Sequence, residues 1–196
     1  MEKLAHADEV VFLWINGLVG TFRPLDEAME WIVSDYLVPA AMALTLLGLW
    51  FGGSASAARM RCQVGVLVAL ASMAIASGAV FALNGVYFRD RPFVDLDVSL
   101  LFYEPTDSSF PANSAAAMFG LAAAVWGIDR RLGAALTLMA ALFSFSRVYA
   151  GVHYPLDIVA AAAIGFVAAG VTLKLRRLVE PLPTMVIKAA RILCLA

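Results

Sequence analysis

The segment from residue 146 to residue 157 brings an arginine, a histidine and an aspartate to the point where two apolar stretches meet. Asp157 follows His153 by four residues, so a carboxylate near a helix start can accept the ring N–H and fix the imidazole tautomer. The other ring nitrogen is then free to attack an electrophile. Arg147 offers a planar fork of donors that suits phosphate oxygens. The segment predicts phosphoryl chemistry at His153, and a snorkelling arginine beside a histidine bound to a loop carbonyl is the alternative interpretation.

Two further polar segments contain candidate phosphate ligands. Arg91 follows an apolar stretch that ends near Asn84, and Arg89 beside it fits an ordinary interfacial anchor better. A polar turn precedes the apolar stretch that starts at Ser114, where Asn113 or Ser114 is predicted to cap a helix. The free N–H groups at such a helix start also form a phosphate cradle, although a cap with no ligand explains the same residues.

The composition is that of a membrane protein. Of 196 residues, 62% are hydrophobic and 15% are charged, compared with about 25% charged residues in a typical soluble domain. The mean hydropathy is +0.84. A net charge of −1 gives no reason to expect nucleic-acid binding. Cys62 and Cys194 have no Cys/His cluster around them and are predicted to be packing residues.

The apolar stretches predict an all-α integral membrane protein, a bundle of five to six transmembrane helices with a long extracytoplasmic loop. The stretch 10–22 is shorter than the about 20 residues that a span needs and is predicted to lie in the interface. We expect one domain, with an interfacial segment at 1–24, a helical bundle at 25–177 and a cytoplasmic tail at 178–196 that ends in an amphipathic helix. The oligomeric state is left open. The five predicted spans are 31–52, 64–84, 114–128, 132–146 and 158–175, and the long loop is 89–111.

The basic residues predict the orientation, because lysine and arginine concentrate on the cytoplasmic side. In a five-span topology, the larger group shares one side: Arg59, Arg61, Arg130, Arg131, Lys174, Arg176, Arg177, Lys188 and Arg191. The smaller group shares the other side: Lys3, Arg23, Arg89, Arg91 and Arg147. The first side should therefore be cytoplasmic. The loop 89–113 and the segment 147–157 then meet on the extracytoplasmic face of the cell membrane.

These three segments, in this order, resemble the motifs of the type 2 phosphatidic acid phosphatase superfamily. That family reads Lys-x6-Arg-Pro, then Pro-Ser-Gly-His, then Ser-Arg-x5-His-x3-Asp. The third motif matches in full, the first matches in its Arg-Pro pair, and the second matches in its proline. Asn84 replaces the lysine of the first motif, and Ser114 replaces the histidine of the second.

The resemblance implies a membrane lipid phosphatase that needs no metal or other cofactor. By analogy, His153 attacks phosphorus and forms a phosphohistidine, and Asp157 orients the imidazole. Arg91 and Arg147 neutralise the phosphate oxygens as charge builds. Asn113 and Ser114 complete the predicted phosphate-binding set. The substrate is a lipid phosphate or diphosphate taken from the bilayer.

The replacement of the second-motif histidine bears on the leaving group. In the family that histidine protonates the leaving oxygen, and general acid catalysis contributes roughly 10²–10⁴-fold. A lipid phosphate leaves with little protonation, so Ser114 favours a polyprenyl diphosphate over a monoester. Glu104, Asp107 or Arg89 are further candidates for the missing function, whereas His6 is predicted to be a surface residue. A catalytically impaired lipid-binding or accessory subunit and a lipid phosphotransferase are the alternative functions.

Overall fold

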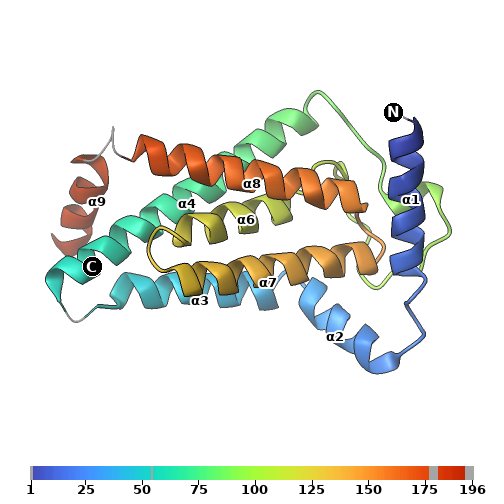
Figure 1. Ribbon diagram of the computed structural model, residues 1–196, viewed down its shortest axis with the longest axis horizontal. Helices are drawn as coiled ribbons and strands as arrows, with labels where there is room; N and C mark the ends of the chain where they lie inside the picture. Colours follow the sequence, from blue (N-terminus) through green and yellow to red (C-terminus); the bar gives the residue numbers. More distant parts are fainter. Residues whose placement is uncertain (1, 54, 177–180, 193–196) are drawn as a thin grey trace.

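The computed structural model describes residues 2–53, 55–176 and 181–192, and within these ranges the regular elements are all helices. The all-α fold class is therefore confirmed. Cys194, Arg177 and the last residues of the predicted tail lie outside the described residues. The helices, labelled in Figure 1, are α1 (Glu2–Asn16), α2 (Arg23–Val33), α3 (Leu37–Phe51), α4 (Ser56–Asn84), α5 (Pro92–Asp95), α6 (Asn113–Val125), α7 (Arg130–Tyr149), α8 (Pro155–Leu175) and α9 (Pro181–Ile192).

Several helices are suited to a bilayer. The helices α4, α7 and α8 are each long and apolar enough to cross a membrane, and α2 with α3 passes the same test as one bent span. The helix α6 has 13 residues, which extend about 20 Å at 1.5 Å per residue, less than the roughly 30 Å of a hydrocarbon core. A predicted span at 114–128 is therefore a short helix here, and the count of five to six spans stays a prediction.

The first predicted span, 31–52, is wrong as a continuous helix. The chain bends by 52° between α2 and α3. The Ser34 hydroxyl donates to the Trp31 carbonyl oxygen over 2.8 Å and accepts from the Leu37 N–H over 3.3 Å, so one side chain serves both helix ends. The break lets the Asp35 side chain reach Arg147 of α7.

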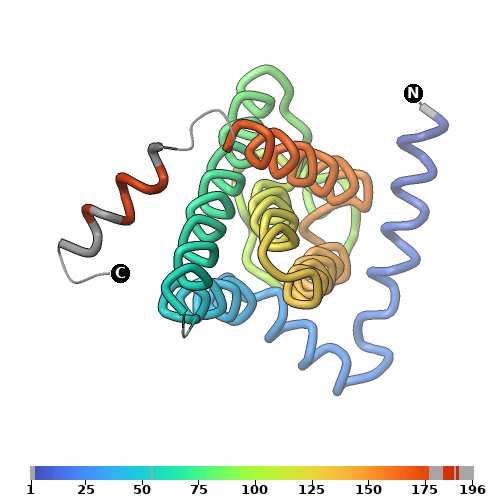
Figure 2. The backbone as a smooth tube through the Cα atoms, turned by 60° about the vertical axis from the view of Figure 1, so that its left-hand side comes forward, coloured from blue at the N-terminus to red at the C-terminus, as the bar shows by residue number. Residues whose placement is uncertain are grey.

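The short helix α6 forms the centre of the bundle. It packs against α4, α7 and α8, and Figure 2 shows it lying between them. Small residues make this approach possible, since a Cβ added at Gly165 of α8 would lie 2.7 Å from the Gly120 backbone nitrogen of α6. The Ser72 hydroxyl of α4 donates to the Gly120 carbonyl oxygen over 2.8 Å. The core is thus set by small side chains on facing helices.

The two ends of the bundle differ in charge. At one end α4 and α7 begin and α8 ends (Figure 1), and we call this the basic end because it carries Arg59, Arg61, Arg130, Arg131, Lys174 and Arg176. The opposite end holds the start of α8, the loop 85–112 and α1, which crosses the end of the bundle in Figure 1. This grouping agrees with the predicted separation of basic residues. The cytoplasmic assignment of the basic end remains a prediction.

Candidate functional site

His153 lies buried in the turn between α7 and α8. Gly151 makes this turn with a φ of 87°, a conformation that favours glycine. The ring atom Nδ1 lies 3.0 Å from the Ser109 carbonyl oxygen, and Nε2 lies 3.2 Å from Nη1 of Arg91. A carbonyl oxygen only accepts and a guanidinium only donates. The proton therefore belongs on Nδ1, and the Nε2 lone pair faces Arg91.

Asp157 does not bind the imidazole directly, which corrects the prediction from spacing. Its Oδ2 lies 3.7 Å from Nδ1 of His153, beyond hydrogen-bond distance. Instead Oδ2 accepts hydrogen bonds from the Ser109 hydroxyl over 2.5 Å and from the Tyr154 N–H over 2.9 Å. Tyr154 is the N-cap residue of α8 and Asp157 is the third residue of that helix. Ser109 thus links the two residues, because its carbonyl oxygen contacts the ring and its hydroxyl contacts the carboxylate.

Arg89 is part of this network, so its prediction as an interfacial anchor is wrong. Its guanidinium donates to Oδ1 of Asp157 over 2.6 Å and to Oδ2 of Asp8 over 2.8 Å. It also lies 3.9 Å from the centre of the Tyr154 ring. Burial lowers the pKa of Arg89, but the carboxylates of Asp157 and Asp8 more than offset that effect, and the pKa is raised. The arginine is a permanent counter-charge for two buried carboxylates.

A stripe on α1 closes this end of the bundle. Asp8, Phe12 and Asn16 are spaced by four residues and are all buried. Asp8 also accepts from the Leu156 N–H over 2.8 Å, and Phe12 packs edge-on against Tyr154. The Asn16 amide donates to the carbonyl oxygens of residues 99 and 149, both over 2.9 Å. The first helix, predicted as an interfacial segment, therefore supports the site through buried polar contacts.

All three guanidinium nitrogens of Arg91 donate hydrogen bonds, and its side chain is buried. Its Nη1 donates to the Val152 carbonyl oxygen over 2.9 Å, Nε donates to the Asp107 carbonyl oxygen over 3.0 Å, and Nη2 donates to Oδ1 of Asp107 over 2.9 Å. A cleft of about 290 Å³ adjoins it and is also lined by Asp107, Phe88 and Phe93. The guanidinium is therefore fixed beside Nε2 of His153 and borders an open cleft.

Arg147, near the end of α7, is held by a residue from the bend between α2 and α3. Its Nη2 donates to Oδ1 of Asp35 over 2.5 Å, and the Tyr103 hydroxyl donates to the other oxygen of that carboxylate over 3.0 Å. The guanidinium lies 4.5 Å and 4.9 Å from the ring centres of Phe102 and Phe143. Its Nε is buried without a hydrogen-bond acceptor among the described residues. Arg147 thus retains a free donor.

The carboxylates that hold the two arginines are more exposed than the arginines themselves. The side chains of Arg91 and Arg147 are 5% and 6% exposed, whereas those of Asp107 and Asp35 are 65% and 41% exposed. An incoming phosphate offers the same kind of acceptor oxygen with more charge. Both guanidinium groups are thus buried, while the carboxylates paired with them are open to solvent.

The second-motif residues do not cap α6. Ala112 is the N-cap of α6, and no side chain caps this helix, so the predicted capping role of Asn113 or Ser114 is wrong. Asn113 is exposed and Ser114 is half-buried. The Ala112 N–H donates to the Asp157 backbone carbonyl oxygen over 3.4 Å, which ties the start of α6 to α8. The predicted phosphate-binding role of Asn113 and Ser114 stays a prediction.

The surroundings of His153 favour its neutral form. Burial lowers the pKa of His153 below its ordinary value; Asp157 opposes this, and the positive charge of Arg91 adds to it. A neutral imidazole has the lone pair that a nucleophile needs. In the described part of the chain, no three His, Cys, Asp or Glu residues are grouped so as to hold a metal ion.

Sequence reasoning missed three supporting residues. Asp8 is marked by its spacing from Phe12 and Asn16, but a four-residue interval in a helix does not say which face is buried. Ser109 acts through its own carbonyl and hydroxyl, and Asp35 acts through a bend. Asp8 and Asp35 have no motif around them, whereas Ser109 stands two residues before the proline of the second motif. His6 is exposed, as predicted.

Comparisons with known proteins agree on the family. A model of the PAP2 superfamily matches residues 65–179. Undecaprenyl-diphosphatase BcrC of Bacillus subtilis (strain 168) is 27% identical over 178 residues, which cover 91% of this chain and 89% of the relative. Putative undecaprenyl-diphosphatase YbjG of Escherichia coli (strain K12) is 27% identical over 137 residues, which cover 69% of this chain and 66% of the relative.

Two solved structures share the fold. LpxE of Aquifex aeolicus superposes with a TM-score of 0.64 at 26% identity, over 84% of this chain and 93% of that one. A PAP2 type phosphatidylglycerolphosphate phosphatase from Bacillus subtilis superposes with a TM-score of 0.61 over 91% of this chain and 89% of that one. Its identity is 20%, so this second likeness supports the fold alone. The superposed portions include most of the helical bundle.

Proposed function

Because the chain belongs to the PAP2 superfamily, a family of membrane lipid phosphatases, we propose that it releases phosphate from a polyprenyl diphosphate through a phosphohistidine at His153. The observation that carries the proposal is the placement of the two ring nitrogens. Nδ1 is held by the Ser109 carbonyl oxygen, and Nε2 lies 3.2 Å from a guanidinium nitrogen of Arg91. A phosphoryl group placed for attack by the Nε2 lone pair of His153 would therefore also lie beside the Arg91 guanidinium.

The proposed reaction has two steps. Nε2 of His153 attacks the terminal phosphorus, the bond from phosphorus to the bridging oxygen breaks, and the lipid monophosphate departs. Arg91 and Arg147 bind the phosphoryl oxygens, where stabilisation of developing charge is the main task of the protein. Asp157 stabilises the imidazole from a distance while Ser109 and Arg89 hold the carboxylate in place. Water then attacks the phosphohistidine and releases inorganic phosphate.

The preference for a diphosphate rests on the residue that is missing. Ser114 stands where the family has an acid, and a serine hydroxyl is a poor proton donor near neutral pH. The Arg89 guanidinium, one candidate substitute, donates to two carboxylates and its pKa is raised, so it gives up no proton. A lipid monophosphate needs little protonation to leave. Two relatives named undecaprenyl-diphosphatase support this substrate class.

The proposed location is the cell membrane, with the site on the extracytoplasmic face. Arg59, Arg61, Arg130 and Arg131 lie at the end of the bundle opposite the site, which supports this orientation. Lysine and arginine favour the cytoplasmic side. A substrate with a membrane-anchored tail then presents its diphosphate to the outer surface.

The test compares three purified full-length proteins in detergent: the wild type, His153→Ala and His6→Ala. His6→Ala is a matched control, because His6 is the second histidine of the chain and is exposed on α1. Each protein is incubated with undecaprenyl diphosphate and, separately, with phosphatidic acid in the presence of EDTA. Inorganic phosphate is measured over time.

We expect wild type and His6→Ala to release phosphate at equal rates and His153→Ala to release none. The rate with the diphosphate should exceed the rate with phosphatidic acid. A wild type as inactive as His153→Ala on both substrates would contradict the phosphatase proposal. Faster release from phosphatidic acid would leave the histidine mechanism in place but contradict the leaving-group argument.

A further inference from the structure

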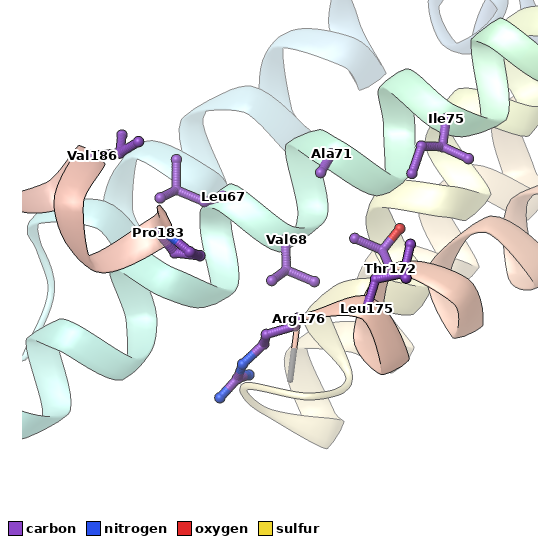
Figure 3. A pocket seen from close by; sticks show the side chains of 9 residues that line it. All are labelled: Leu67, Val68, Ala71, Ile75, Thr172, Leu175, Arg176, Pro183 and Val186. Carbon is purple, nitrogen blue, oxygen red and sulfur yellow. The ribbon is translucent and has the colours of Figure 1, made fainter. Parts of the chain in front are cut away.

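Two cavities adjoin each other at the basic end of the bundle, away from the candidate site. The first is an apolar groove of about 380 Å³ between α4, α8 and α9. Figure 3 shows Leu67, Val68 and Ala71 of α4 on one side of it, with Pro183 and Val186 contributed by α9. The groove exists because α9 packs against α4. Its lining is suited to a hydrocarbon chain.

The second cavity is a smaller polar pocket of about 210 Å³. Arg61 from α4 and Arg176 after the end of α8 both line it, together with Cys62. Arg176 lines the apolar groove as well, and Figure 3 shows its side chain extending away from the apolar side chains of that groove. A polar pocket and an apolar groove therefore meet at one arginine.

The charge of the polar pocket is not neutralised by the described chain. Neither Arg61 nor Arg176 forms an ion pair or a side-chain hydrogen bond with any residue that the structure describes, in contrast to Arg89, Arg91 and Arg147. Two arginines that border one pocket repel each other unless an anion lies between them. The pocket is thus complementary to a phosphate group.

We propose that these two cavities form one binding site for an anionic phospholipid. The lipid phosphate lies between Arg61 and Arg176, and one acyl chain lies in the groove between α4, α8 and α9. The site is at the end of the bundle where a basic pocket between membrane helices meets the headgroups of a leaflet. Phosphatidylcholine, a zwitterionic lipid, carries a quaternary ammonium that offsets the attraction. The proposed site is separate from the proposed catalytic site and does not depend on it.

Cys62 provides a local probe of occupancy. Its thiol is free, and the residue is half-buried in the wall of the polar pocket. In full-length, delipidated protein with Cys194→Ser, a water-soluble maleimide reports access to Cys62 alone. The labelling rate is measured in micelles containing phosphatidylglycerol, phosphatidylcholine or inorganic phosphate without phospholipid.

We expect phosphatidylglycerol to slow labelling at least about tenfold, the order expected for a charge-assisted contact. Phosphatidylcholine and inorganic phosphate should leave the rate unchanged. The variant Arg61→Gln/Arg176→Gln should lose the protection. The matched control Arg130→Gln/Arg131→Gln removes two positive charges from the same end but from outside both cavities, and it should keep the protection.

Three results would overturn the proposal. Equal protection by phosphatidylcholine would show that the groove binds lipid without regard to charge. Protection by inorganic phosphate alone would identify a free-anion site. Equal loss of protection in both double variants would show a general effect of surface charge. The comparison of lipids uses the arginine-intact protein, so the proposal is testable even if the Arg61→Gln/Arg176→Gln variant does not fold.

Discussion

Removal of the Arg89 guanidinium leaves the carboxylates of Asp8 and Asp157 buried without their shared counter-charge. Both carboxylate side chains are 0% exposed, and the arginine side chain is 21% exposed. We therefore expect Arg89→Ala to destabilise the protein strongly and to displace Asp157 from the His153 side of the site. The same loss should lower the rate of phosphate release.

The magnitude follows from two charge-assisted hydrogen bonds of 2.6 Å and 2.8 Å. Hydrogen bonds to charged groups contribute about 1.5–3 kcal/mol each, and removal of one member of a buried ion pair costs about 3–5 kcal/mol. Partial access of water to Arg89 favours the lower end of that range, about 3 kcal/mol. For a chain of this length, the corresponding fall in Tm is about 6–12 °C.

The assay is thermal unfolding in one detergent, with Arg23→Ala as a matched control. Arg23 also forms an ion pair, with Glu27, but its side chain is 90% exposed, so its loss should shift the Tm by no more than about 2 °C. Asp8→Asn adds a second test. It should destabilise the wild type, but in the Arg89→Ala background it should be less harmful or stabilising because it removes one unpaired charge.

An Arg89→Ala variant that unfolds within about 2 °C of wild type would refute the reasoning. It would mean that water or another cation neutralises Asp8 and Asp157 when the guanidinium is absent. Strict additivity of Arg89→Ala and Asp8→Asn would also count against it, since the expected destabilisation requires direct coupling of the two side chains.

Three further predictions follow from the same contacts. Because the pKa of His153 is lowered and the neutral ring is the nucleophile, kcat/KM should stay high as pH falls through about 6.5 and decline only below it; an acid limb above 6.5 in a pH–rate profile would contradict this. Ser109→Ala removes a donor to Asp157 but keeps the carbonyl that binds the ring, so kcat should fall about tenfold or more with little change in KM. Gly165→Ala places a Cβ 2.7 Å from the nitrogen of Gly120 and should cost about 1–3 kcal/mol in thermal unfolding, whereas Gly170→Ala meets nothing within 4 Å and should not destabilise.

The family and the fold class were predictable from the sequence because they depend on local patterns. Long apolar stretches require helices in a bilayer, since backbone polar groups must be satisfied within the segment. The spacing of Arg147, His153 and Asp157 in one short segment is set by the covalent chain. The grouping of basic residues at one end of the bundle follows from the order of the apolar stretches.

The helix ends were less predictable. The span 31–52 is divided because Ser34 serves two helix ends, and the stretch 114–128 forms a helix of 13 residues. Hydropathy averages over a window and does not register a single hydroxyl that stops a helix. The short α6 is stable as a central helix because its neighbours on α4 and α8 are small.

The partners of each charged side chain were decided by the tertiary structure. Asp8 and Asp35 are far in sequence from the arginines they bind, and Ser109 contacts His153 across 44 residues of chain. Spacing alone favoured a direct bond from Asp157 to the imidazole, yet the carboxylate is held by Arg89, Ser109 and a backbone N–H instead. The sequence by itself determined which chemical groups reach this end of the membrane bundle. The packing of the helices and of the loop 85–112 decided which of these groups are in contact. A hydrogen bond requires its donor and acceptor to lie close together, and only the folded chain sets that distance.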